Sequence, residues 1–408
     1  MIPMSGSNRR RPVRIDLPVL AVYFVLAPVH QTLVLSDGST VVRYLAAAAM
    51  AACILQGWLE RREFVIRWDL IWPVLFMAGW FALTILWARS LSAAVLKYIQ
   101  FLSYFALMLV VSSRDWTEGE KRFVIRAVIL ACVFYSGRLV LSAAAARRAT
   151  ISFALNDDAF SADQNVLALH IGTGALFALH GSVTEKRGVL RVLCFAGFLV
   201  MLAGILSTGS RGGLVALAAA AAWLGIRYSR NSARARQILP KAVGAAVLLA
   251  GVILGLNLWN NETIVSRYSE LTLASLAGRL EIWGEYLELL FRRPLGFLAG
   301  YGIGCETLEH AAFLGRSWQR ATHNDMLSLV CQAGIPGLLL AGVLVRKAWS
   351  RNARLRDCLG RACVFLALIG SMDINFFMTY GWWNALIFAF IGIGTAGPSG
   401  RSEAVGAC

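Results

Sequence analysis

A short polar segment, Thr322-His323-Asn324-Asp325, stands directly before a long apolar run and contains the residue best suited to acid–base chemistry. Thr322 and Asp325 have the spacing of a helix start, with Thr322 as the N-cap and Asp325 at the third helical position. His323 would then lie in the first helical turn. There the positive end of the helix dipole favours the neutral imidazole that a general base needs near pH 7. We predict that His323 is the catalytic base.

Arginines supply the charge that such a base would need beside it. Thirteen of the 39 Lys and Arg residues lie outside the basic tracts that set membrane topology, and all of these but Lys97 are arginine. An arginine fork binds phosphate with two parallel hydrogen bonds, although pairing with nearby acids explains part of the set. Arg211, in the tight turn 207–213, and Arg279 are the strongest predictions. The further arginines predicted to bind substrate are Arg147, Arg148 and Arg138.

The elements that must position these residues are membrane spans. The chain is 58% hydrophobic and 15% charged, which is too apolar for a soluble domain. We therefore predict an all-α integral membrane fold of about twelve transmembrane helices, forming one polytopic domain over residues 1–408. The predicted spans are 17–35, 41–59, 70–88, 94–111, 123–145, 166–181, 189–206, 213–226, 242–258, 324–345, 363–377 and 381–395.

The distribution of basic residues predicts the orientation of this domain. Alternate loops hold 26 of the 39 Lys and Arg residues, which places those loops and both termini in the cytoplasm. The net charge of +16 therefore reflects topology and not nucleic-acid binding. His323 and the remaining arginines then face outward. Residues 259–323 form the one large outer loop, and within it 279–291 has the pattern of an amphipathic helix, with Leu280, Trp283, Leu287 and Leu290 on its apolar face.

Missing motifs narrow the chemistry. The sequence has no Walker motif, dinucleotide fingerprint, HExxH or Asp-x-Asp, so the energy for a reaction must come from the substrate. The eight cysteines show no disulfide or zinc spacing. A metal held by Glu306, Glu309, His310 and His323 is a minor alternative, and we predict neither a metal nor a cofactor. The remaining candidate residues suit a group transfer in which His323 deprotonates the acceptor hydroxyl and arginines stabilise a departing diphosphate.

Three motifs resemble those of the bacterial O-antigen ligase and polymerase family. They are Ser210-Arg211-Gly212-Gly213, then Gly278-Arg279 with Trp283 and Pro294-Leu295-Gly296, and finally His323-Asn324 followed by Gly334-Ile335-Pro336-Gly337. Asp163-Gln164-Asn165 is a looser match, because the family usually has proline where Gln164 stands. By these matches the resemblance adds Ser210, Asn324 and Asn165 to the predicted substrate-binding residues.

The resemblance implies a GT-C-like glycosyltransferase in the bacterial inner membrane, with its active site facing the periplasm. It implies an undecaprenyl-diphosphate-linked polysaccharide as donor, and the single large loop is most like the O-antigen ligase, whose acceptor is lipid A core in lipopolysaccharide biosynthesis. Membrane lipids are the other expected partners. An O-antigen polymerase, which shares the donor, and a lipid-linked oligosaccharide transporter are the alternatives.

Overall fold

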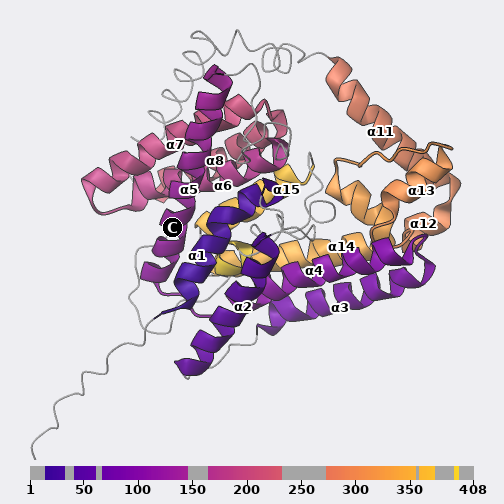
Figure 1. Ribbon diagram of the computed structural model, residues 1–408, viewed down its shortest axis with the longest axis horizontal. Coiled ribbons are helices and arrows are strands. Elements are labelled where there is room, and N and C mark those ends of the chain that lie inside the picture. The colour runs from indigo at the N-terminus through magenta and orange to yellow at the C-terminus, as the bar shows by residue number, and fades with distance from the viewer. Residues whose placement is uncertain are drawn as a thin grey trace, which may run out of the picture.

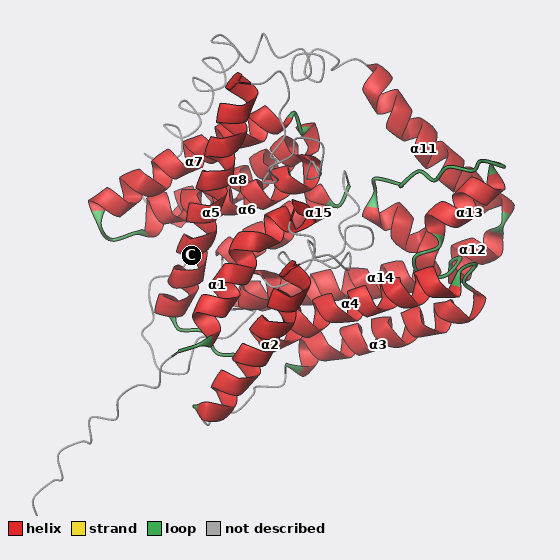
Figure 2. Cartoon of the chain, viewed as in Figure 1, coloured by secondary structure: helices red, strands yellow, loops and turns green. Residues whose placement is uncertain are grey.

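The computed structural model describes residues 14–32, 41–60, 67–145, 164–231, 273–354, 358–372 and 390–394, and these residues form helices joined by turns (Figure 2). The helices are α1 (Asp16–Leu26), η1 (Ala27–Thr32), α2 (Val41–Leu59), α3 (Trp68–Thr84), η2 (Ile85–Trp87), α4 (Leu91–Ser112), α5 (Glu118–Ala145), α6 (Gln164–Thr184), α7 (Gly188–Thr208), α8 (Arg211–Asn231), α11 (Leu273–Arg292), α12 (Pro294–Ala299), α13 (Glu306–Phe313), α14 (Asp325–Arg354) and α15 (Cys358–Gly370). Within the described residues, eight helices are long and apolar enough to cross a membrane. The chain is an integral, multi-pass membrane protein.

Most predicted spans coincide with these helices, and α2 has the predicted bounds. The first span is shorter than predicted, because α1 ends at Leu26 and the chain continues as a 3-10 helix that contains Pro28. Proline lacks the amide that an α-helix needs and crowds the preceding turn. Residues 242–258 lie outside the described residues, as does most of 381–395. The total of twelve spans stays a prediction.

One group of helices packs around α6. Nearly every side chain of α6 from Val166 to Ser182 is buried, and α5, α7, α8 and α15 surround it. Small residues permit close contact, since a methyl group at Gly174 would lie 2.6 Å from Cys132 Cβ in α5. Such small residues are typical of helix packing in membranes. The arrangement fixes the ends of α6 and α8 relative to each other, which matters for the site below.

A second group, α3, α4 and α14, runs side by side, with α12 and α13 beyond one end (Figure 1). Here α14 is broken at Gly334, where φ is 66°. The amides of Tyr301 and Gly302 donate to the carbonyls of Cys331 and Gln332, at 2.7 and 3.1 Å. The loop that contains Gly300, Gly302 and Gly304 therefore lies on this break and on the turn between α3 and α4. Trp87 Nε1 donates to Gly300 O at 3.0 Å, so α12 ends level with the end of α3.

The predicted amphipathic helix is present as α11, but a different face is buried. Leu280 and Leu287 are exposed, whereas Tyr286 and Leu289 are fully buried. These two residues pack with Val330 and Cys331 of α14. The buried stripe of α11 therefore lies beside the predicted apolar face and shares Leu290 with it, because the partner of α11 is the first segment of α14.

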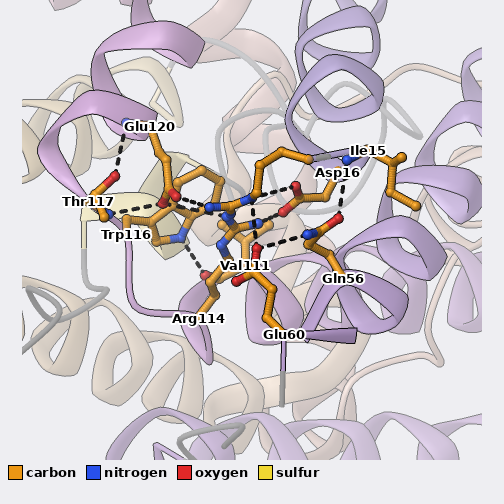
Figure 3. Close-up of polar contacts among 10 residues, drawn as sticks. Ile15, Asp16, Gln56, Glu60, Val111, Arg114, Trp116, Thr117 and Glu120 are labelled. Carbon is orange, nitrogen blue, oxygen red and sulfur yellow. Dashed lines mark hydrogen bonds and ion pairs between the residues drawn. The ribbon is translucent and has the colours of Figure 1, made fainter. Parts of the chain in front are cut away.

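Charged side chains form a buried cluster at the other end of the bundle (Figure 3). Asp16, at the start of α1, is 0% exposed and pairs with Arg14 at 3.4 Å and with Arg114. Arg14 also pairs with Glu60 at 3.2 Å and with Glu120, and Arg114 reaches Glu120 at 3.4 Å. Three carboxylates and two guanidinium groups thus join the start of α1, the end of α2, the end of α4 and the start of α5. This end is the one that the basic tracts predict to be cytoplasmic.

Candidate functional site

The N-terminal ends of α6, α8 and α14 come together at the end of the bundle away from this cluster. A methyl group at Gly213 in α8 would lie 2.6 Å from Ala168 Cβ in α6, and one at Gly370 would lie 2.8 Å from the Leu169 side chain. The amide of Asp325, the first residue of α14, donates to Ser371 O at 2.9 Å, just after α15 ends. The N-terminus of a helix attracts negative charge. Three such ends favour an anionic ligand in this region.

The turn between α7 and α8 presents Arg211. Gly209 takes the left-handed conformation, with φ at 67°, and α8 begins two residues later. Ser210 Oγ accepts a hydrogen bond from the Gly213 amide at 3.2 Å and so caps α8. Arg211 follows as the first helical residue and is half-buried. Gly213 permits close packing of α8 on α6.

Arg279 lies in α11 within electrostatic reach of Arg211. Burial lowers the pKa of Arg279, and the positive charge of Arg211 lowers it further. Both effects disfavour the charged form of a guanidinium group. A bound anion would relieve the repulsion between the two cations, which are therefore suited to receive a diphosphate.

The next turns of α11 hold the loop that leads to His323. Trp283, four residues after Arg279 and on the same face, donates from Nε1 to Thr322 O at 2.8 Å. Tyr286 donates from its hydroxyl to Arg320 O at 2.6 Å. The Tyr286 ring also stacks on His310, with ring centroids 4.0 Å apart. One helix thus carries Arg279 and fixes the backbone next to His323.

The predicted helix start at Thr322 was wrong by two residues. Helix α14 begins at Asp325, and Asn324 caps it, since its Oδ1 accepts from the Leu327 amide at 3.1 Å. His323 therefore lies before the helix, half-buried, with a left-handed φ of 48°. Asparagine is as good an N-cap as threonine, and the contact of Thr322 O with Trp283 holds Thr322 outside the helix. The side-chain oxygen of Asn324 therefore caps α14, where the resemblance had predicted a contact with substrate.

Comparison with known families supports this grouping. Residues 196–342 match the model of a family described as O-antigen ligase. This segment is similar to the O-antigen ligase family. No curated protein matches the chain. The matched segment runs from α7 into α14 and contains Ser210, Arg211, Arg279, His323 and Asn324, which are the predicted site residues that the structure gathers at one end of the bundle.

The other predicted site residues lie outside the segment matched by the O-antigen ligase family. Asn165 is half-buried in the first turn of α6, one turn before the Ala168 that meets α8. Arg138 is exposed on the same stripe of α5 as Phe134 and Leu141, which faces away from α6 and α7. The structure does not bring Arg138 into the group. Arg147 and Arg148 lie outside the described residues.

The residues of the minor metal alternative contact different partners. His310 Nε2 lies 3.1 Å from Glu285, and Glu309 pairs with Arg293 at 3.2 Å. Glu306 is buried against Ser328 Oγ at 3.3 Å, and burial raises its pKa against the opposing effect of Lys97. Within the described part of the chain, no three potential ligands cluster.

Sequence reasoning placed Trp283 on an apolar face and missed its hydrogen bond to the His323 loop. We expect Trp283→Phe to lower the transfer rate about five- to tenfold. Phenylalanine retains an aromatic ring but lacks the indole N–H that holds the loop before His323. Initial rates of glycan transfer measure this. Trp87→Phe is the matched control, since it loses an equivalent indole bond to Gly300 O and should keep its rate. Equal rates in all three proteins would show that the bond does not position His323.

Proposed function

We propose that this protein is an O-antigen ligase that moves polysaccharide from undecaprenyl diphosphate to a sugar hydroxyl of lipid A core. The match of residues 196–342 to the O-antigen ligase family supports ligase- or polymerase-type transfer. The observation that carries the proposal is that Arg211 of α8 and Arg279 of α11 lie within electrostatic reach of each other, and that α11 also holds the His323 loop. In this proposal the protein lies in the bacterial inner membrane, its termini are cytoplasmic, and the site faces the periplasm.

The chemical step follows from these groups. His323 takes the proton of the acceptor hydroxyl, and the resulting oxygen nucleophile attacks the anomeric carbon of the donor. A new carbon–oxygen bond forms as the bond from that carbon to the diphosphate breaks. The electron pair leaves with the diphosphate, whose added negative charge Arg211 and Arg279 stabilise together with the helix ends. A general base and preorganised positive charge are what this displacement requires.

Reconstitution tests the proposal directly. Purified full-length protein is mixed with undecaprenyl-diphosphate-linked glycan and lipid A core in detergent, and the products are separated by mass. Glycan attached to lipid A core identifies a ligase. Glycan chains that lengthen on the lipid identify a polymerase. Unchanged substrates, together with movement of the lipid-linked glycan across proteoliposomes, would identify a transporter and refute the proposed transfer.

We expect transfer to continue in EDTA at a rate close to that without it. The sequence offers arginines and no Asp-x-Asp to hold a divalent ion on the diphosphate. The same reconstituted reaction, with and without EDTA, measures this. A reaction that stops in EDTA and recovers with Mg²⁺ or Mn²⁺ would contradict the expectation and direct attention to Glu306, Glu309 and His310.

A further inference from the structure

An exposed aromatic side chain lies between two arginines on the loop from α13 to α14. Trp318 is 50% exposed, so the core does not explain it. The Arg316 guanidinium carbon lies 4.8 Å from the centroid of its ring and that of Arg320 lies 5.3 Å away. Such cation–π contacts orient the ring and both forks together. The three side chains form a surface that we call the Arg–Trp–Arg platform.

The backbone under this platform is held in place. Tyr286 donates to Arg320 O at 2.6 Å, and Thr307 Oγ1 donates to Gln319 Oε1 at 2.7 Å. Trp283 fixes Thr322 O two residues later. A platform ordered before binding pays less conformational entropy when a ligand arrives. The fixed loop also sets the distance from the platform to His323, only three residues beyond Arg320.

The platform carries net positive charge. Arg316 pairs with Glu285 at 3.0 Å, and Glu285 also contacts His310. Burial lowers the pKa of His310, and Arg316 and Arg320 add to this effect while Glu285 opposes it. Glu285 therefore neutralises the charge of Arg316 and leaves the charge of Arg320 unbalanced. In the described part of the chain the Arg320 guanidinium makes no ion pair, so its charge stays available for a ligand.

The platform lies near the turn between α3 and α4. Gln319, next to Trp318, accepts a hydrogen bond from Thr307, and two residues before Thr307 the Cys305 Sγ donates to Ser90 O in that turn at 3.7 Å. Side chains at the ends of spans meet the headgroup and aqueous layers. Sugars and phosphates of those layers are the ligands within reach of the platform.

We propose that Arg316, Trp318 and Arg320 bind an anionic saccharide, a phosphorylated or carboxylated sugar of the acceptor. The flanking forks bind a phosphate or carboxylate with paired hydrogen bonds, and the exposed part of the indole ring packs against the C–H groups of the sugar. That the bound sugar belongs to an acceptor rests on the proposed function, because only then does a saccharide hydroxyl need to reach His323. Binding of the anionic sugar itself does not depend on turnover.

Saturation-transfer NMR on the purified full-length protein in detergent tests this binding, with glucose 6-phosphate and uncharged glucose as probes. We expect Trp318→Ala and Arg320→Gln to weaken binding of glucose 6-phosphate by about tenfold, the usual effect of losing a contact to a charged group. Trp318→Tyr keeps a ring and should restore most of the signal. The matched controls are Trp58→Ala, at a position 74% exposed in α2, and Arg292→Gln, whose side chain pairs with Glu288. Both controls should bind like the natural protein.

Several results would overturn the platform. One is a glucose 6-phosphate signal that is equal in the natural protein and in both platform variants. Another is an equal loss for uncharged glucose, which would remove the selectivity for charge. A spin label at position 318 that is more accessible to oxygen than to a water-soluble nickel complex would place the loop among acyl chains.

Kinetics separates this inference from the proposed function. In an active preparation, Trp318→Ala should raise the KM for lipid A core and leave kcat and the donor KM near their natural values. His323→Ala should bind glucose 6-phosphate normally. If no preparation transfers glycan but the sugar still binds in the expected pattern, the proposed function fails and the platform stands. If transfer occurs and the acceptor KM is unchanged in both platform variants, the platform fails and the proposed function stands.

Discussion

Replacing His323 with alanine should lower the rate of glycan transfer by about 10²- to 10⁴-fold, which is the usual contribution of a general base. The side chain lies outside α14 on a loop whose carbonyl groups at Arg320 and Thr322 are held by α11. Removal of the imidazole leaves those contacts in place. Donor binding, measured separately with labelled lipid-linked glycan, should therefore stay near its natural value.

Because His323 has a left-handed backbone conformation, a second variant is needed to separate loss of the imidazole from backbone strain. Its φ of 48° is a conformation that asparagine tolerates better than alanine. His323→Asn thus keeps the loop and has no group that takes up a proton near pH 7. Both variants should lose transfer if the imidazole is the base. Activity retained in His323→Asn and lost in His323→Ala would assign the defect to backbone strain and refute the base.

Lysine at position 211 or 279 should reduce kcat by about 10²-fold, the lower end of what losing one preorganised donor costs. A lysine preserves the charge but replaces a planar fork with a single flexible ammonium group. The measurement is kcat with the donor saturating. Arg292→Lys is the matched control for Arg279→Lys in α11, because Arg292 is 68% exposed and its ion pair within the described residues is with Glu288, one turn away. Full activity in both Arg211→Lys and Arg279→Lys would exclude a bidentate phosphate role.

The Arg279→Lys variant should also respond to pH. Burial and the charge of Arg211 lower the pKa of the cation at position 279, and a lysine starts from a lower value than an arginine. A cation whose pKa is lowered loses its charge earlier as pH rises. Residual activity of this variant should therefore fall at alkaline pH before that of the natural protein does.

Sequence patterns predicted elements that depend on their own residues. The apolar run of α2 gave its bounds, and the spacing in 279–291 gave α11. The cap of α14 was misplaced because Thr322 and Asn324 are both good N-caps, and a tertiary contact from Trp283 decides between them. At the break in α14, Pro336 cannot donate to the Gln332 carbonyl, and the Gly302 amide that takes its place comes from a distant loop that no local pattern reveals.

The site followed the same division. Residue types made Arg211, Arg279 and His323 the candidates, because charge near a membrane and a lone histidine near a helix start are visible in one sequence. Their mutual placement was not visible, since it depends on how α8, α11 and α14 meet. Trp283 and Tyr286 looked like packing residues. Their polar atoms act on backbone carbonyls, which leave no trace in the spacing of side chains.

The buried cluster around Asp16 has a consequence for biosynthesis. Arg14 and its partner Glu120 are 106 residues apart in the chain, so at about 5–20 residues per second the ribosome needs roughly 5–20 seconds to supply the second after the first. During that interval Arg14 has Asp16 and then Glu60 as partners, while Arg114 and Glu120 are still missing. The ion pairs that join α1, α2, α4 and α5 are therefore complete only after the start of α5 has been synthesised.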